Sequence, residues 1–252
     1  MRERTKVLHV LTTSAGGLGQ SVLTIMTSLD RERYELHAAF GPGYPLDGAF
    51  AAAGISTHML ALSRGIHPLQ FARTLMQLAR IMRRERFDIV HVHGSEAGVL
   101  ARLAAWLTRV PRVVVELHGY ANRDPDSLME RTVYRWIERA LDPLTDAYVA
   151  VSDAVRRAWV ARGIVTHDRV RVIHHGLDLT RYPDRERAPR TSPPLVVGTV
   201  CLLEERKGLH ALVEAMPRVI ETVGDVRFVI AGEGPLKARM QQRIAELGIA
   251  DR

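Results

Sequence analysis

Short apolar runs alternate with amphipathic segments along almost the whole chain, and this alternation constrains the fold more than any other feature. The runs are nearly continuously apolar, as is typical of strands buried on both faces of a parallel sheet. Between them, apolar residues recur at helical spacing, as Phe71, Leu75, Leu78 and Met82 do. Strand–helix alternation predicts βαβ units, and therefore an α/β fold with a doubly wound parallel sheet. The predicted strands cover residues 6–12, 34–40, 56–62, 87–93, 112–118, 146–152, 169–175, 194–200 and 226–232.

A proline-rich stretch interrupts the alternation. Residues 178–194 contain four prolines, many charged residues and no apolar period, which is a composition typical of a linker. We therefore predict a first domain at 1–177, a linker at 178–193 and a second domain at 194–252. The second domain has only two of the predicted strands. Two strands and two helices cannot cover both faces of a parallel sheet, so we expect this domain to be incomplete.

The charge of the chain limits its partners. The formal net charge is +7 and the sequence pI is about 10.0, a balance that favours phosphorylated ligands, polyanions or an anionic membrane surface. No basic run is interleaved with aromatic residues, so we expect no nucleic-acid partner. The single cysteine, Cys201, excludes an internal disulfide, and Arg102 interrupts the apolar run at 99–110 so that it cannot span a bilayer. These features predict a cytoplasmic protein.

A glycine-rich turn, TSAGGLGQSV at 13–22, follows the first predicted strand and opens a helix. Glycines such as Gly16 and Gly17 allow close backbone approach, and a helix N-terminus presents free N–H groups to an anion. The turn resembles the beginning of the dinucleotide-binding fingerprint, but Val22 stands at the third glycine position. No acidic residue follows the second strand to hold a ribose hydroxyl, which argues against a nicotinamide-dependent oxidoreductase.

Two further turns precede helices in the C-terminal part of the chain. GTVCLLEERKGLHALVEA places Lys207 and Gly208 where a helix begins, so that an ammonium group and helix N–H donors meet at one spot. This pattern favours phosphate binding, and the alternative interpretation is a solvated turn lysine. IAGEGPLKARM contains Gly232 and Gly234 before Pro235, and these residues are interpreted either as ligand contacts or as turn and helix-start residues only.

In this order, the motifs resemble the family-4-type glycosyltransferases of the GT-B fold over essentially the whole chain. The resemblance implies two Rossmann-like domains, the first on the acceptor side and the second binding a nucleotide sugar. It also implies transfer of a sugar from a nucleotide-diphosphate donor to an acceptor hydroxyl, with retention, without a required metal and without a cofactor. The matching segments are VLHVLTTSAGGLGQSV, FDIVHVHGSEAGVLARLAA, VVVELHGY, AYVAVSDAVRRAWVARG, RVRVIHHGLDLTRY, GTVCLLEERKGLHALVEAM and FVIAGEGPLKARM.

The resemblance also assigns roles to individual residues. Lys207 matches a phosphate-binding lysine, and Gly16 and Gly17 match a loop that borders the donor phosphates or the acceptor. His118 matches a first-domain histidine near the transferred sugar, where we expect a hydrogen bond to a sugar hydroxyl. Without the resemblance, His118 is interpreted as a core histidine at a strand end. The predicted catalytic residues are His118 and Lys207, and the predicted donor-binding residues are Gly16, Gly17, Arg206, Lys207, Gly232 and Gly234.

The chain departs from the family pattern in two places. The family's second phosphate cation is usually an arginine five residues before the lysine, where this chain has Leu202, and the adjacent Arg206 is a candidate to compensate. After Gly248, a helix-stop glycine, the sequence lacks the stretch in which two glutamates contact the donor sugar and ribose. We therefore expect residues 1–252, as a fragment or a truncated gene product, to bind donor weakly and to transfer little sugar.

Several expectations about partners follow. The acceptor is either a saccharide or a lipid-linked molecule, and the basic charge would suit peripheral contact with the inner face of a membrane. Uncovered apolar edges on 194–252 would favour self-association. No metal site is expected: His91 and His93 share one face of a strand and His174 and His175 end another, but a metal needs three or four converging ligands. The alternative function is a non-catalytic remnant that binds an acceptor or partner.

Overall fold

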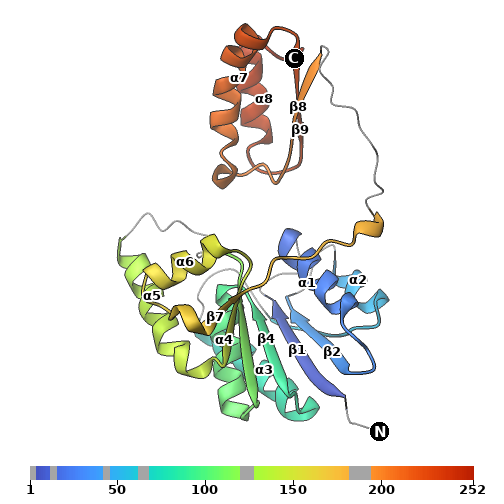
Figure 1. Cartoon of the computed structure of the whole chain (residues 1–252), viewed down its shortest axis with the longest axis vertical. Coiled ribbons are helices and arrows are strands. Elements are labelled where there is room, and N and C mark those ends of the chain that lie inside the picture. The colour runs from blue at the N-terminus through green and yellow to red at the C-terminus, as the bar shows by residue number, and fades with distance from the viewer. Residues whose placement is uncertain (1–3, 12–15, 42–45, 62–67, 120–127, 182–193) are drawn as a thin grey trace. The chain divides into compact units, whose positions relative to one another are not determined.

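The computed structural model describes residues 4–11, 16–41, 46–61, 68–119, 128–181 and 194–252 (Figure 1). The chain divides into two compact units, Met1–Tyr182 and Pro183–Arg252, and each is described by itself. The division falls inside the segment that has the composition of a linker, whose residues 182–193 lie outside the described residues. The domain limits taken from the sequence stay predictions.

The first unit alternates strands and helices in the order that the sequence predicts (Figure 1). None of the helices in the described ranges is both long enough and apolar enough to cross a bilayer. The elements are β1 (Thr5–Leu11), α1 (Gly16–Ser28), β2 (Tyr34–Phe40), α2 (Asp47–Ala52), β3 (Ser56–Met59), α3 (Pro68–Glu85), β4 (Ile89–His93), α4 (Ser95–Thr108), β5 (Arg112–Leu117), α5 (Leu128–Leu141), β6 (Ala147–Ala150), α6 (Asp153–Ala161) and β7 (Val170–Val172).

The strands of this unit form one parallel sheet in the order β3-β2-β1-β4-β5-β6-β7. Side chains of β1 alternate between its faces: Val7 and Leu11 pack in one core cluster with α1 and α2, whereas Leu8 and Val10 pack in another with α3 and α4. The prediction of a doubly wound parallel sheet is therefore confirmed. The strand order reverses between β1 and β4, and such a switch point is where open α/β sheets bind ligands, at the carboxyl ends of the strands.

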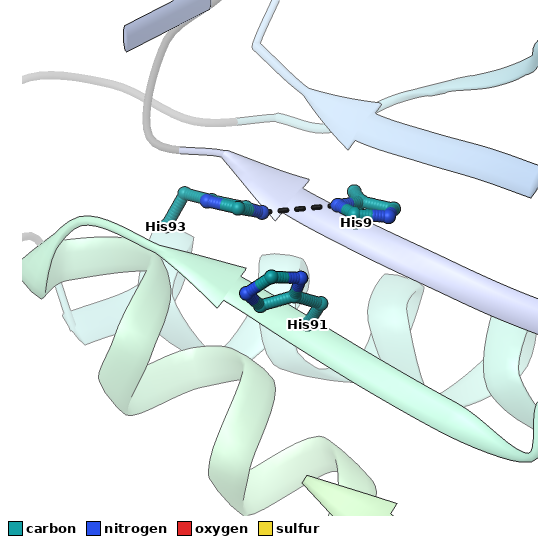
Figure 2. Close-up of side chains that lie close together, drawn as sticks. All are labelled: His9, His91 and His93. Carbon is teal, nitrogen blue, oxygen red and sulfur yellow. Dashed lines mark hydrogen bonds between the residues drawn. The ribbon is translucent and has the colours of Figure 1, made fainter. Parts of the chain in front are cut away.

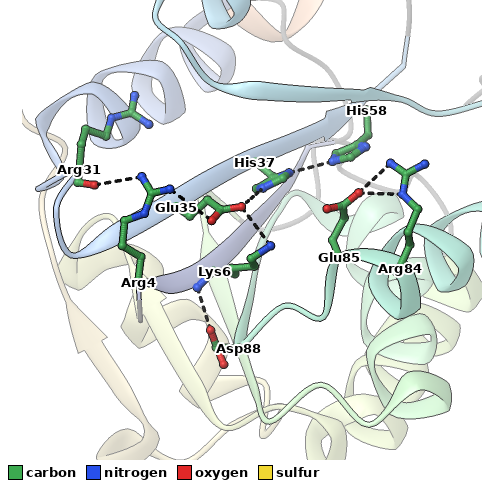
Figure 3. Close-up of polar contacts among 9 residues, drawn as sticks. All are labelled: Arg4, Lys6, Arg31, Glu35, His37, His58, Arg84, Glu85 and Asp88. Carbon is green, nitrogen blue, oxygen red and sulfur yellow. Dashed lines mark hydrogen bonds and ion pairs between the residues drawn. The ribbon is translucent and has the colours of Figure 1, made fainter. Parts of the chain in front are cut away.

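A line of polar groups crosses β1, β2 and β3 away from that switch point (Figure 3). Glu35 accepts Lys6 Nζ at 3.1 Å and His37 Nε2 at 3.1 Å. The other ring nitrogen of His37, Nδ1, lies 3.0 Å from Nε2 of His58. Because His37 uses a different nitrogen toward each neighbour, the carboxylate and the two imidazoles form a chain of pairwise contacts.

Within its described residues, 194–252, the second unit contains two parallel strands and two α-helices, as the sequence predicts. Its core lies on the helix side, where Leu203, Val213, Met216 and Met240 are buried. Within the described residues the strands leave several valines exposed, of which Val200 is 87% exposed. The elements are β8 (Leu195–Val200), the 3₁₀ turn η4 (Glu205–Lys207), α7 (Leu209–Val223), β9 (Val226–Ala231) and α8 (Lys237–Glu246).

A buried ion pair joins α4 to α5 in the first unit. Arg102 Nη2 donates to Glu138 Oε2 at 2.8 Å, and each side chain is about 1% exposed. Arg102 Nε also donates to the carbonyl oxygen of Gly98 at 2.9 Å. The arginine that interrupts an apolar run in the sequence therefore has its charge balanced inside the core.

We expect Glu138→Gln to destabilise the first unit by about 3–5 kcal/mol, because it leaves the Arg102 guanidinium buried without a counter-charge. Trp106, Trp136 and Trp159 are the three tryptophans of the chain and all lie in this unit. Tryptophan fluorescence during urea unfolding therefore reports on the unit by itself. The control is Arg112→Gln, which removes a largely exposed pair with Asp146 and should change stability by less than about 1 kcal/mol. Equal effects of the two substitutions would contradict the expectation.

Two glycines at the end of β9 lie against the backbone that follows β8. A Cβ atom built on Gly232 would stand 1.9 Å from the carbonyl oxygen of Cys201. Gly234 has a φ of +156°, and a Cβ there would stand 2.4 Å from the carbonyl oxygen of Leu203. The atoms that these Cβ atoms would meet belong to the backbone, which cannot move aside as a flexible side chain can. Both positions therefore require glycine for packing.

Gly232→Ala should destabilise the second unit by about 3 kcal/mol, at the upper end of the range for overpacking. Cys201, the one cysteine of the chain, lies in this unit and reports its opening through the rate of thiol labelling. We expect labelling to become roughly a hundredfold faster. Gly198→Ala is the matched control, because its Cβ would meet only an ordinary contact at 3.8 Å. Unchanged labelling of the Gly232→Ala variant would show that the turn rearranges freely.

Candidate functional site

The carboxyl ends of β4 and β5 bring four polar side chains together beside the switch point of the sheet. The strand register pairs His93 with Glu116, and His118 directly follows the end of β5. His175, which follows β7, reaches the same carboxylate. The sequence analysis named His118 and noted His93 and His175, but it did not single out Glu116, which lies at the centre.

Glu116 is 4% exposed and lies within contact distance of an imidazole on each side. His93 Nδ1 lies 3.2 Å from Glu116 Oε2 and 3.3 Å from His118 Nε2. His118 Nε2 lies 3.8 Å from Glu116 Oε1, and His175 Nε2 is 3.0 Å from the same oxygen. Three atoms that can each present a lone pair, from His93, Glu116 and His118, therefore lie within 4.8 Å of one another.

Two more histidines extend this cluster into the sheet (Figure 2). His9 on β1 is paired in register with His91 on β4, and its Nδ1 lies 3.0 Å from His93 Nε2. His91 Nε2 lies 3.4 Å from Glu116 Oε2 but does not hydrogen-bond to it. In the described part of the chain, Nε2 of His9 and Nε2 of His91 are buried without a hydrogen-bond partner.

The histidines and the carboxylate affect one another's protonation. Burial lowers the pKa of His91 to about 3 and that of His118 to about 4, and it holds the pKa of His9 well below its usual value. Burial would raise the pKa of Glu116, but the hydrogen bond from His93 and the nearby imidazoles hold it well below its usual range. Near neutral pH the cluster therefore contains an ionised carboxylate beside the neutral imidazoles of His91 and His118.

A small cavity adjoins the cluster. It has a volume of about 60 Å³, and its lining includes Gly94, Glu116, His118 and Gly119. The indole Nε1 of Trp159 closes one side by donating to the carbonyl oxygen of Gly119 at 3.1 Å. A space of this size can hold water or a small polar group beside the imidazole of His118.

In the second unit, the predicted helix start at Lys207 is confirmed. Lys207 ends η4, Gly208 follows in the left-handed conformation with a φ of 67°, and α7 begins at Leu209. The side chain of Lys207 is exposed, and within the described residues it has no carboxylate partner. Lys6 and Lys237 are each paired with a glutamate, at 3.1 Å and 2.6 Å.

The other predicted site residues remain predictions. Gly16 opens α1 with a φ of +63°, and a Cβ on Gly16 or Gly17 would meet nothing within 4 Å. Residues 12–15 of that turn and the side chain of Arg206 lie outside the described residues. The packing of Gly232 and Gly234 directly supports the interpretation of these glycines as turn residues.

Solved structures of other proteins align with almost the whole chain. Anabaena HepE in complex with UDP and glucose aligns with a TM-score of 0.75 and 19% identity, covering 99% of this chain and 68% of HepE. A glycosyltransferase from Rickettsia africae aligns with a TM-score of 0.71 and 17% identity, covering 98% of this chain and 66% of the other. The first unit thus has the Rossmann-like fold of a GT-B N-terminal domain, and the second corresponds to part of the second domain.

Curated relatives match over nearly the whole chain. One is the UDP-Gal:alpha-D-GlcNAc-diphosphoundecaprenol alpha-1,3-galactosyltransferase of Escherichia coli, with 26% identity over 244 residues and 92% of this chain. Another is the alpha-D-kanosaminyltransferase of Streptomyces kanamyceticus, with 26% identity over 244 residues and 88% of this chain. The chain spans 63% and 59% of the lengths of these two relatives.

Two family models divide the sequence between them. The model described as Glycosyl transferases group 1 matches residues 182–252. The model described as Glycosyltransferase Family 4 matches residues 15–181, which is well over half of the chain. The chain therefore belongs to glycosyltransferase family 4.

Proposed function

We propose that the chain serves a glycosyltransferase that moves a sugar from a nucleotide-diphosphate donor to an acceptor hydroxyl. The bond between the sugar and the diphosphate breaks as the bond to the acceptor oxygen forms, with retention at the sugar carbon, and the proton of the acceptor hydroxyl passes to the departing diphosphate. The reaction requires no cofactor and no metal on the diphosphate. Family membership and the transferase names of both curated relatives support this proposal.

The observation that carries the proposal is the exposed ammonium group of Lys207 at the start of α7, which has no carboxylate partner in the part of the chain that the structure describes. The departing diphosphate accumulates negative charge, and groups that stabilise this charge lower the barrier to transfer. A helix N-terminus offers free N–H donors and the positive end of the helix dipole. Lys207 adds a full positive charge at that position, inside the segment that matches the Glycosyl transferases group 1 model.

His118 is proposed to act on the sugar rather than on the phosphates. Its pKa near 4 leaves the imidazole neutral at physiological pH, so it can accept or donate one hydrogen bond without adding charge. The adjoining cavity gives space for a hydroxyl group beside this ring. Gly16 and Gly17 are proposed to border the donor or acceptor. The space beside each glycine is open, because a Cβ atom built there would meet no other atom within 4 Å.

Uridine diphosphate sugars are the donors that we propose first. HepE structures are described as complexes with UDP and UDP-glucose, and the E. coli relative carries UDP-Gal in its name. The name of that relative also specifies a diphosphoundecaprenol-linked sugar as its acceptor. We propose a saccharide or lipid-linked acceptor for this chain, with peripheral membrane contact through its basic surface and a cytoplasmic location.

Lys207→Ala should weaken UDP binding by tenfold to a hundredfold, because one charge-assisted hydrogen bond contributes about 1.5–3 kcal/mol. Ligand-observed NMR with residues 1–252 detects the weak binding that we expect. Arg218→Ala is the matched control, since it removes the same charge from an exposed position in the C-terminal half of α7. Equal UDP affinities for the two variants would contradict the role of Lys207.

Chelation should leave UDP binding unchanged. If protein cations and helix N–H groups hold the diphosphate, the UDP affinity in EDTA should agree within about twofold with that in MgCl₂. A Mg²⁺-dependent gain of tenfold or more in UDP affinity would mean that the diphosphate is bound through a metal.

The alternative function is a non-catalytic binding domain. Sugar binding without any release of UDP from UDP-glucose or UDP-galactose would favour it.

A further inference from the structure

The cluster around Glu116 has the geometry of a metal site. In a tetrahedral zinc site, nitrogen and oxygen ligands lie about 2.0–2.2 Å from the ion, so they lie about 3.3–3.5 Å from one another. Here Nδ1 of His93 is 3.2 Å from Glu116 Oε2 and 3.3 Å from His118 Nε2. All three ligand groups are within 4.8 Å of one another.

We propose that His93 Nδ1, Glu116 Oε2 and His118 Nε2 bind a divalent transition-metal ion, with Zn²⁺ as the best fit. Two imidazoles and one carboxylate form a ligand set that zinc accepts in proteins, with a fourth position open to water or a ligand. The cavity beside His118 is the space for that fourth ligand. Sequence spacing could not indicate this site, because its ligands come from two strands and the loop after one of them.

The surrounding residues supply the second layer of contacts that a metal site needs. If His93 binds the ion through Nδ1, its proton is on Nε2, which lies 3.0 Å from Nδ1 of His9 and can donate to it. Glu116 Oε1 remains free to accept a hydrogen bond from His175 Nε2 at 3.0 Å. Two of the three proposed ligands are therefore already oriented by neighbours.

Without an ion, the same contacts are hard to satisfy. Nδ1 of His93 faces a carboxylate oxygen and a second imidazole nitrogen at almost equal distances, and one proton cannot serve both. Glu116 is more than nine-tenths buried, with His93 Nδ1 at 3.2 Å from one carboxylate oxygen and His175 Nε2 at 3.0 Å from the other. A divalent cation would accept a lone pair from His93, Glu116 and His118 at once.

The other histidine group of the first unit provides an internal comparison (Figure 3). His37 lies between Glu35 and His58, with Nε2 toward the carboxylate and Nδ1 toward the second ring. Each ring nitrogen of His37 therefore has a single partner, and Glu35, His37 and His58 lie in a row rather than around a common point. Histidines beside a carboxylate are thus arranged in two different ways in this unit, and His93, Glu116 and His118 form a group that could hold an ion.

The proposed ion goes beyond the proposed transfer reaction, which requires no metal on the diphosphate. It would occupy the Nε2 lone pair of His118 and so withdraw that atom from a sugar hydroxyl. Bound Zn²⁺ would in this way oppose sugar binding at the first unit. The site itself does not depend on the transfer reaction, and it can be tested with the metal alone.

The test uses untagged residues 1–252, stripped with a chelator and titrated with Zn²⁺ by calorimetry in the absence of nucleotide. We expect one equivalent to bind, and Co²⁺ to give the intense visible absorption of a tetrahedral site. Glu116→Gln and His118→Ala should each weaken Zn²⁺ binding at least tenfold. His118 is partly exposed and follows the strand, so its replacement keeps the test valid if the buried Glu116→Gln variant fails to fold.

His58→Gln is the matched control, because it removes an imidazole from the other histidine group of the same unit, and it should bind Zn²⁺ as the unchanged chain does. Absence of Zn²⁺ binding would overturn the proposal. Binding that persists unchanged in both Glu116→Gln and His118→Ala would also overturn it, since the ion would then be held elsewhere. Weak UDP binding has no bearing on either outcome, so failure of the transfer proposal is distinguishable.

Discussion

The parallel register of β1, β4 and β5 is the constraint on which the candidate site of the first unit depends. It pairs His9 with His91 and His93 with Glu116, and the alternation of side chains along each strand then directs all four to the same face. A shift of one residue in β4 would move both of its histidines to the opposite face, among the apolar side chains that pack against α3 and α4. The apolar residues Val90 and Val92 therefore fix the position of the polar cluster as firmly as its own hydrogen bonds do.

Among the residues whose burial is described, the first unit buries two glutamates and compensates them by different means. Glu138 has a permanent cation, Arg102, at 2.8 Å, and the pair joins two helices. Glu116 has histidines instead, whose charge depends on their surroundings. A carboxylate paired with arginine is a fixed structural element. A carboxylate surrounded by histidines can still exchange a proton, hydrogen-bond to a hydroxyl group or bind a metal ion. The chemistry of this unit is accordingly expected at Glu116 and not at Glu138.

The sequence predicts the strands, their alternation with helices and the helix start at Lys207, because each of these is a local pattern of apolar spacing or capping. It does not predict the histidine cluster, because that depends on β1 and β4 being neighbours although two strands separate them in the chain. Glu116 carried a signal that could have been used: it is the one charged residue inside the apolar run VVVELH. Gly232 and Gly234 show a different limit of sequence analysis. A glycine that makes room for a ligand and a glycine that makes room for neighbouring backbone cannot be distinguished in the sequence.

The two candidate sites differ in the charge that they can accept. The ionised carboxylate of Glu116 beside the neutral imidazole of His118 would repel a diphosphate, so the cluster suits a hydroxyl group or a cation. The exposed ammonium group of Lys207 at a helix N-terminus suits an anion. An enzyme that transfers a sugar needs both kinds of surface, one for the neutral polyol and one for the charged leaving group. We propose that each unit of this chain carries one of them, with the acceptor and sugar at the first unit and the diphosphate at the second, because the charges of the two candidate sites are complementary.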